Sequence, residues 1–255
     1  MRLTFLGTGT SMGVPVIGCR CAVCRSDDPR NRRLRTSALV ETGALTLLID
    51  AGPDLRQQAL GVGLTRLDAV LLTHAHADHV AGLDDLRPLN FAQQRAIPVY
   101  GSRETLAAVR ERFAYAFAEP DGSTRPSLDL IACDPAEPFF IGPVAVRPLD
   151  IQHGSWTITG FRIGRLGYVT DASAVPPASR EQLRDLDVLV LNALRPTPHP
   201  THFSLDEAVA LAEELRPRRT LLVHMNHEVD HETCNARLPA HVQLAYDGQV
   251  VEIAE

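Results

Sequence analysis

The chain has 255 residues, of which 45% are hydrophobic and 22% charged, so it can form a sizeable core and lacks the charge excess of a disordered protein. Its net charge of -6 comes from 31 acidic and 25 basic residues, and every basic residue is an arginine. This balance argues against a protein that coats nucleic acid. No apolar run approaches the roughly 20 residues of a membrane span, and the start of the chain does not resemble a signal peptide. We therefore expect a cytoplasmic protein without a membrane partner.

Short β-rich segments alternate with helical segments along the chain. The predicted strands span residues 2–6, 45–50, 69–73, 97–100, 144–148, 157–163, 188–191 and 220–223. The clearest helix spans residues 204–215, where Ser204 and Glu207 form a capping box and apolar side chains repeat along one face. Since no linker or internal repeat interrupts this pattern, we predict a single α/β domain over residues 1–255.

A dense histidine cluster follows the predicted strand at 69–73. The segment from 74 to 79 reads His-Ala-His-Ala-Asp-His, and so places His74, His76, Asp78 and His79 close together. Buried imidazoles at such density would be costly to desolvate or would repel one another if protonated, whereas neutral imidazole is a common metal ligand. A single ion does not need so many ligands. The motif therefore predicts two ions, one held by His74 and His76 and its neighbour by Asp78 and His79.

Three further ligand-type side chains lie near the ends of later apolar strands. These are His153, Asp171 and His224. Each alone is weak evidence, because a lone histidine at the end of a strand is usually structural. Together they supply a third histidine for each ion and a carboxylate that can bridge both, which is the composition of a dinuclear hydrolytic site.

With these residues the chain resembles the metallo-β-lactamase superfamily. The resemblance implies a four-layer αββα sandwich with a dinuclear site along one edge. By the family pattern the first ion is held by His74, His76 and His153, the second by Asp78, His79 and His224, and Asp171 bridges them. Asp50, at the end of a predicted strand, resembles the family's carboxylate that orients a ligand histidine, with a simple turn residue as the alternative.

A cysteine motif lies near the start of the chain. Three of the five cysteines, Cys19, Cys21 and Cys24, crowd into residues 19–24, a spacing better suited to metal binding than to mutual disulfides. Together with the segment at 4–15, this motif resembles the phosphodiesterase branch of the superfamily, specifically the phosphoribosyl 1,2-cyclic phosphate phosphodiesterase family. That resemblance implies a structural zinc knuckle at 19–24 completed by His227, with His231 as a weaker candidate for the fourth ligand. Cys133 and Cys234 match nothing.

The same resemblance identifies His202 as a catalytic histidine on the substrate side of the site, whereas His199 is expected to lie on the surface. It implies that a metal-bridging hydroxide attacks phosphorus, that Asp78 and Asp171 position it, and that His202 protonates or stabilises the departing sugar oxygen. The implied enzyme is a dinuclear metal-dependent phosphoric diester hydrolase. Its implied substrate is a small cyclic phosphodiester such as phosphoribosyl 1,2-cyclic phosphate.

Two alternatives remain open at this point. A tRNA 3′-processing endonuclease shares the metal motif, but normally carries a basic arm that grips tRNA, and neither such an insertion nor stable nucleic-acid binding is expected here. A non-catalytic, carrier-like relative, as in pyrroloquinoline-quinone biosynthesis, predicts degraded metal ligands, and here the set is intact.

Other properties are not settled by the sequence. The catalytic ligands suit Zn²⁺, Mn²⁺ and Fe²⁺ alike, beside one structural Zn²⁺. The exact substrate, the oligomeric state, with a homodimer among the alternatives, and the roles of Arg35, Asp84, Asp85 and Arg87 also stay open.

Overall fold

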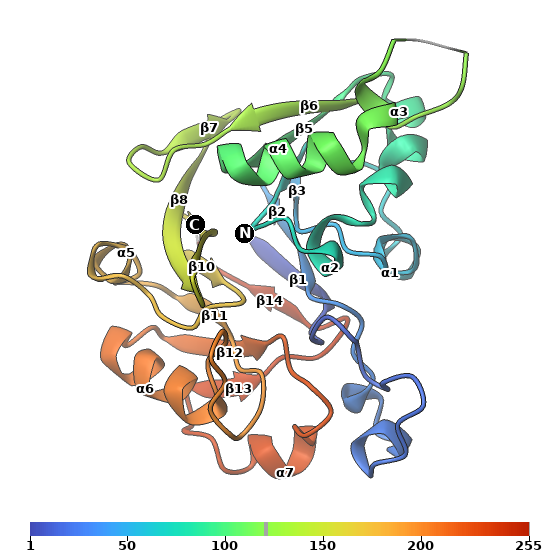
Figure 1. Ribbon diagram of the computed structural model, residues 1–255. Helices are drawn as coiled ribbons and strands as arrows, with labels where there is room; N and C mark the ends of the chain where they lie inside the picture. Colours follow the sequence, from blue (N-terminus) through green and yellow to red (C-terminus); the bar gives the residue numbers. More distant parts are fainter. Residues whose placement is uncertain (120–121, 255) are drawn as a thin grey trace.

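In the computed structural model, which describes residues 1–119 and 122–254, two sheets lie face to face (Figure 1). Within the described residues the first sheet has seven strands, in the spatial order β14 (Val250–Glu252), β1 (Arg2–Gly7), β2 (Ser37–Thr42), β3 (Leu45–Ile49), β4 (Ala69–Leu71), β5 (Ile97–Gly101) and β6 (Leu128–Ala132). Strands β14 to β3 pair antiparallel, and β3 to β6 pair parallel.

The second sheet repeats this mixed pattern with the later part of the chain. Its described strands follow the order β13 (Val242–Leu244), β12 (Arg219–Val223), β11 (Val188–Asn192), β10 (Leu166–Val169), β9 (Trp156–Ile163), β8 (Val144–His153) and β7 (Phe139–Ile141). Strands β10 to β13 pair parallel, and β7 to β10 pair antiparallel.

The central strands are apolar because both of their faces are buried. In β11, Val188 and Val190 point into the core between the sheets, while Leu189 and Leu191 point outward under helices. In β3, Leu47 and Ile49 join the inter-sheet core and Leu48 faces the other way. Continuous apolar segments therefore form strands here, and the alternation of side chains divides each segment between two cores.

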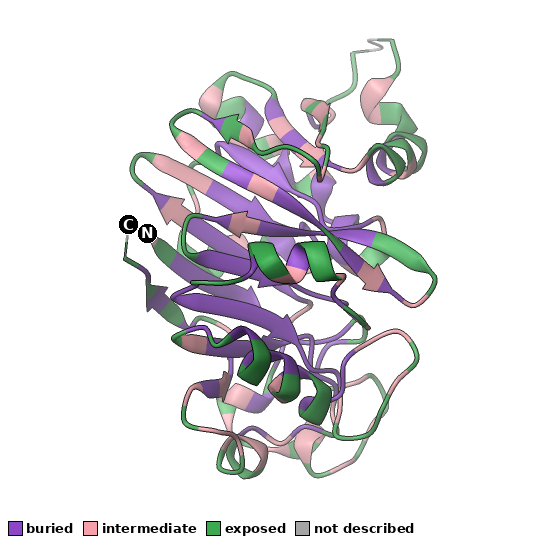
Figure 2. Ribbon diagram, turned by 90° about the vertical axis from the view of Figure 1, so that its left-hand side faces the viewer, coloured by how far each residue is buried: buried purple, intermediate pink, exposed green. Residues whose placement is uncertain are grey.

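Helices cover the outer face of each sheet, as Figures 1 and 2 show. The first sheet is covered by α1 (Leu55–Val62), α2 (Ala77–Val80), η3 (Leu83–Leu86), α3 (Arg87–Gln93), α4 (Arg103–Arg112) and η4 (Ala114–Phe117). The second sheet carries α5 (Pro177–Gln182), α6 (Leu205–Leu215) and α7 (His231–Asn235). Two short 3-10 turns, η1 (Val23–Arg25) and η2 (Pro29–Asn31), lie in the loop between β1 and β2. The resulting order of helix, sheet, sheet and helix confirms the predicted αββα sandwich.

The predicted elements agree with this fold in type but differ in detail. Helix α6 begins after Ser204, whose side chain and that of Glu207 form the expected capping box. Strand β8 continues five residues beyond the predicted end at 148, and β4 ends two residues before the predicted 73. Strands β2, β6, β7, β13 and β14 were not predicted, because most are short or lie at sheet edges, where the apolar pattern is weak. Strand β10 was expected only as the apolar segment before Asp171, without bounds. No helix among the described residues is long and apolar enough to cross a membrane.

Candidate metal centre

The predicted ligands converge where several strands end. His74 and His76 follow β4, and Asp78 and His79 lie in the short helix α2. The later side chains each end or follow a strand: His153 is the last residue of β8, Asp171 follows β10 and His224 follows β12. The sandwich thus brings residues 150 positions apart in the sequence to one place, which the sequence pattern alone could not demonstrate.

Ligand atoms in this cluster form overlapping groups whose members lie within 4.8 Å of one another. The groups are His74 with His76 and His153; His74 with His79 and Asp171; Asp78 with His79 and His224; and His153 with Asp171 and His202. Asp171 is central to them. One of its carboxylate oxygens lies 3.1 Å from His224 Nε2 and the other 3.4 Å from His79 Nε2. His79 and His224 belong to the second proposed set, and the groups with His74 and His153 bring the same carboxylate near the first, so it lies between the two sets.

Three residues of the site hold a left-handed backbone conformation. Asp50, Asp171 and His224 have φ angles of 59°, 58° and 59°. A non-glycine residue in this region is uncommon, and such conformations persist only where the surrounding structure imposes them. Asp50 and His224 directly follow the end of a strand and Asp171 is the second residue after one, so in each case a sharp turn at the strand end directs the side chain toward the cluster.

Hydrogen bonds orient the imidazole rings. His153 Nδ1 lies 2.8 Å from the carbonyl oxygen of Thr201, so it must donate to that oxygen and leave Nε2 without a proton. The buried carboxylate of Asp50 lies 2.7 Å from His79 Nδ1 and accepts from the backbone N–H and hydroxyl of Thr73. His79 Nε2 is thereby directed at the cluster. Asp50 thus has the contacts expected of an orienting carboxylate and is more than a simple turn residue.

The charge distribution suits cation binding. Burial lowers the pKa of His74 well below its usual value, which favours the neutral imidazole that a metal requires. Burial acts against ionisation of Asp171, but the imidazoles of His224 and His79 outweigh it and hold the pKa of this carboxyl well below its usual range. The cluster therefore pairs a neutral imidazole at His74 with an ionised carboxylate at Asp171, while the carboxylates of Asp171 and Asp50 raise the pKa of His79 despite its burial, so that a bound cation would take the place of the His79 proton.

Buried nitrogen atoms without partners test whether metal ions fit this site. His79 Nε2 and both ring nitrogens of His224 are buried and lack a hydrogen-bond partner. Buried polar atoms are normally satisfied, and leaving one unsatisfied costs about 1–3 kcal/mol. A divalent cation at the cluster would satisfy the Nε2 atoms, and the donor set of imidazoles and carboxylates suits Zn²⁺, Mn²⁺ or Fe²⁺. The residues of the cluster therefore fit divalent metal ions.

His202 contacts a proposed metal ligand directly, in addition to its predicted position on the substrate side of the site. Its Nε2 is 3.1 Å from a carboxylate oxygen of Asp171, and its Nδ1 is 2.8 Å from the hydroxyl of Thr201. Its ring also stacks on that of His224, with centroids 5.0 Å apart. Both roles, ligand and substrate contact, are compatible with this position. His199 is half-buried and lies 3.3 Å from His202, so it is less peripheral than the expected surface residue.

A second cluster contains the three cysteines of the predicted knuckle. Cys19 Sγ and Cys21 Sγ lie 3.2 Å and 3.4 Å from His227 Nδ1, and the four ligand atoms of Cys19, Cys21, Cys24 and His227 lie within 4.8 Å of one another. All described cysteines are free thiols. The backbone N–H of Cys24 points at the sulfur of Cys21 and lowers the pKa of that thiol to about 6. His231, the weaker candidate, does not belong to this group.

We predict that Cys21→Ser removes about one zinc per chain and lowers the Tm by about 5 °C or more, because a closed thiolate site adds folding free energy. Metal analysis and a thermal melt test this. Cys234→Ser is the matched control, since it makes the same change at a thiol outside the knuckle. Full zinc content in the Cys21 variant would show that the cysteine cluster is not a metal site.

The charged residues of undetermined role are largely paired with one another. Arg35 forms an ion pair with Asp54 at 3.0 Å and donates to the carbonyl of Ser11. Arg87 pairs with Asp84 at 2.5 Å, and Tyr115 also donates to Asp84. Asp85 is exposed. Arg35, Asp84 and Arg87 thus each have an ion-pair partner, and none of them belongs to the ligand groups of the cluster.

Sequence reasoning missed Trp156 and Thr201. The indole of Trp156, 52% exposed, packs against the His76 ring with centroids 4.9 Å apart, and Thr201 fixes both His153 and His202. Trp156 was detectable as the single tryptophan of the chain, three residues after a predicted ligand. Thr201 contacts His153 through its backbone carbonyl and His202 through its hydroxyl, and the sequence gives no signal for either contact.

Comparisons with known proteins show which proteins the chain is similar to. Residues 46–225 match the family model described as beta-lactamase superfamily domain. A solved structure described as a new diphosphatase from the PhnP family superposes with a TM-score of 0.93 and 43% identity, covering 98% of this chain and 97% of that one.

Two curated relatives extend the comparison. The octanoyltransferase of Porphyromonas gingivalis is 40% identical over 251 residues, which are 97% of this chain but 51% of that protein, so the chain spans about half of its length. The ribonuclease Z of Mycobacterium bovis is 31% identical over 214 residues, covering 76% of this chain and 71% of that protein.

Proposed function

The chain belongs to the metallo-β-lactamase superfamily and is PhnP-like within it, and from that premise we propose that it is a metal-dependent phosphodiesterase acting on small diesters. The membership confirms the resemblance seen in the sequence. The observation that carries the proposal lies at the strand ends, where His79 Nε2 and His224 Nε2 are buried without a hydrogen bond and lie 3.4 Å and 3.1 Å from the Asp171 carboxylate. Such an arrangement is suited to binding a metal ion.

We assign the proposed ligands as the sequence implied. His74, His76 and His153 would hold one ion, Asp78, His79 and His224 the second, and Asp171 would bridge. When bound, two such ions supply Lewis acidity, which lowers the pKa of water and offsets the charge of the phosphate oxygens. A structural Zn²⁺ would occupy the cluster of Cys19, Cys21, Cys24 and His227.

The chain's own residues orient the reacting groups. Asp78 and Asp171 can accept a proton or hydrogen bond from the attacking water, and Asp50 fixes the ring of His79. Burial lowers the pKa of His202, so its neutral form predominates near neutral pH, and its Nε2–H now faces Asp171. With a diester bound, the same N–H can donate to the departing oxygen and stabilise it. This favours leaving-group stabilisation over full proton transfer as the role of His202.

Two kinds of phosphate linkage fit the proposed site, a cyclic diester and a diphosphate anhydride. The phosphoribosyl 1,2-cyclic phosphate of the sequence resemblance has a cyclic diester, whereas the name of the PhnP-family diphosphatase points to a diphosphate linkage. Similarity to a ribonuclease Z supports the tRNA endonuclease as a second candidate. The acidic balance of the chain, with no lysine, disfavours a strong grip on a long polyanion.

Metal analysis combined with a substrate panel tests the proposed function. Protein purified without added metal should contain about three ions per chain, two at the cluster and one at the knuckle. It should hydrolyse bis(p-nitrophenyl) phosphate and small cyclic diesters faster than it cleaves a pre-tRNA. Preferred cleavage of the pre-tRNA would establish the endonuclease instead, and an absence of hydrolysis on the entire panel by metal-loaded protein would refute both. The cytoplasmic location, the single domain and a homodimer stay predictions.

A further inference from the structure

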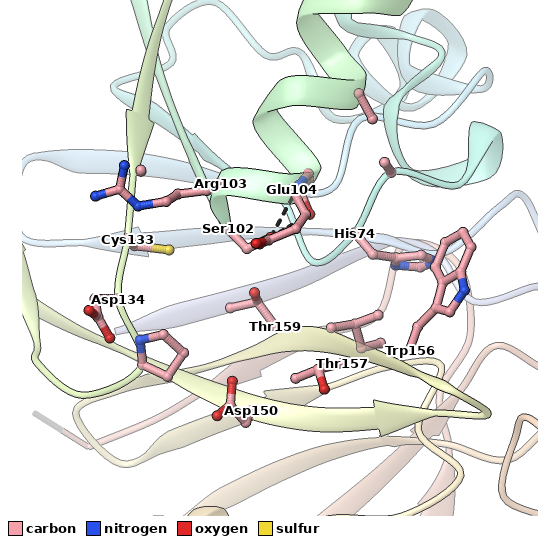
Figure 3. Close-up of a pocket in the computed structure, with 16 residues that line it drawn as sticks. His74, Ser102, Arg103, Glu104, Cys133, Asp134, Asp150, Trp156, Thr157 and Thr159 are labelled. Carbon is pink, nitrogen blue, oxygen red and sulfur yellow. Dashed lines mark hydrogen bonds between the residues drawn. The ribbon is translucent and has the colours of Figure 1, made fainter.

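A cavity of about 730 Å³ opens beside the metal centre. It lies between the first turn of α4, the loop that follows β6 and the hairpin of β8 and β9. Figure 3 shows His74 and Trp156 at one end of it and Arg103, Cys133 and Asp134 toward the other. Its volume is in the range of about 300–1,000 Å³ that is usual for small-molecule sites. Because His74 belongs to the proposed ligand set, a group attached to a phosphate at the metal centre can extend into this cavity.

The charged side chains of the cavity are predominantly acidic. The lining contains one guanidinium, that of Arg103, and three carboxylates, those of Glu104, Asp134 and Asp150, so its formal charge is -2. Glu104 directly follows Arg103 in the first turn of α4, and Asp134 lies toward the same end of the cavity as Arg103 (Figure 3). Burial raises the pKa of the Cys133 thiol to about 11, which keeps this side chain neutral. The charged side chains of the lining would therefore repel a second phosphate placed in this cavity.

The uncharged part of the lining suits a flat, hydroxyl-bearing group. The exposed indole of Trp156 stands at the entrance, where it can stack on an aromatic ring. Hydroxyls of Ser102, Thr157 and Thr159 line the interior. The carboxylates accept hydrogen bonds and so can bind hydroxyl and amino groups. A ribose carrying a heterocyclic base presents these features, whereas a sugar carrying a further phosphate lacks the ring and adds the wrong charge.

We propose that this cavity binds the uncharged nucleoside arm of the phosphodiester substrate and selects against an arm that carries a second phosphate. The inference rests on the proposed phosphodiesterase function and names the substrate class of the same site.

Matched substrate pairs test the charge selection. Adenosine 2′,3′-cyclic phosphate is compared with the same compound bearing a 5′-phosphate, and ribosyl 1,2-cyclic phosphate with its 5-phosphate. In each pair we expect kcat/KM to be about tenfold or more higher for the compound without the second phosphate. Of the two unphosphorylated compounds, the adenosine diester should be the better substrate, and this advantage should shrink in Trp156→Ala but persist in Trp156→Phe.

Variants of the lining test whether the charge of the cavity causes the preference against a second phosphate. The double variant Asp134→Asn with Asp150→Asn should bring the ratio within each pair toward one, because the lining then loses its excess negative charge. Asp129→Asn is the control, since Asp129 is an exposed carboxylate on β6 outside the cavity, and its ratios should equal those of the wild type. A preference for the second phosphate would identify Arg103 as an anion receptor and overturn the inference, as would ratios that the double variant leaves unchanged.

The two proposals fail in different ways. If the enzyme hydrolyses bis(p-nitrophenyl) phosphate but prefers phosphorylated arms, the phosphodiesterase stands and the cavity assignment is wrong. If metal-loaded protein hydrolyses no diester, the proposed function itself is wrong, and binding of adenosine, measured by calorimetry, tests the cavity alone. Calorimetry should then detect adenosine binding that Trp156→Ala weakens, and no such binding would reject the nucleoside site.

Discussion

Replacing Asp171 by alanine is expected to lower phosphodiesterase activity by about a thousandfold or more and to reduce the metal bound at the cluster. The reason is geometric: its two carboxylate oxygens lie 3.1 Å from His224 Nε2 and 3.4 Å from His79 Nε2, both in the second proposed set. The carboxylate also lies in groups with His74 and His153 of the first set, whose ligand atoms are within 4.8 Å of it. Metal content and the rate on bis(p-nitrophenyl) phosphate are the measurements.

Backbone effects need a separate control in this experiment. Asp171 has a positive φ, where alanine is strained, so a loss of activity could reflect folding alone. Asp185→Ala makes the same change at an exposed aspartate with a φ of 57°, and Asp171→Asn keeps the shape of the side chain while removing its charge. We expect Asp185→Ala to stay active and Asp171→Asn to lose metal. Near-normal activity in Asp171→Ala would refute the dinuclear assignment.

Replacing His202 by alanine is expected to leave the metal content intact and to lower kcat by about a hundredfold on a diester with an alkyl leaving group. The loss should be much smaller for a p-nitrophenyl ester, because that phenolate departs readily without stabilisation. The structure permits this role, since His202 Nε2–H is oriented by Asp171 on one side of the ring and Nδ1 is held by Thr201 on the other.

The same variant also tests the alternative role of His202. His199→Ala, in the same loop, should cause a smaller loss that is equal on both substrates. Equal losses in His202→Ala would indicate binding of the phosphate instead of the leaving group. Loss of metal in His202→Ala would make this residue a ligand, as its place in one group with His153 and Asp171 allows.

The fold class and most of the candidate ligand residues could be predicted from the sequence, for identifiable physical reasons. The four candidate ligands between His74 and His79 lie within six residues of one another, so the sequence alone indicates a metal site. Strand β3 was also predictable, because burial of both faces demands an unbroken apolar segment.

Other features depend on contacts that no sequence pattern encodes. The left-handed turns at Asp171 and His224 arise from tertiary context, and no local motif specifies them. The hydrogen bond between His153 and the carbonyl of Thr201 joins residues 48 positions apart through a backbone atom. The acidic cavity is assembled from α4, the loop after β6 and the hairpin of β8 and β9, so its charge could not be summed before the fold was known.

The four-residue segment from His224 to His227 connects the two clusters: His224 belongs to the histidine and aspartate cluster, and His227 belongs to the cysteine cluster. Both intervening residues are held in place: Met225 exchanges backbone hydrogen bonds with Thr8 and Thr10, and the carbonyl of Asn226 accepts from the buried guanidinium of Arg33. The segment therefore acts as a short rigid spacer of fixed length. During evolution a single-residue insertion or deletion here would misplace a ligand of both clusters at once, so related chains should vary in length on either side of this spacer and not within it.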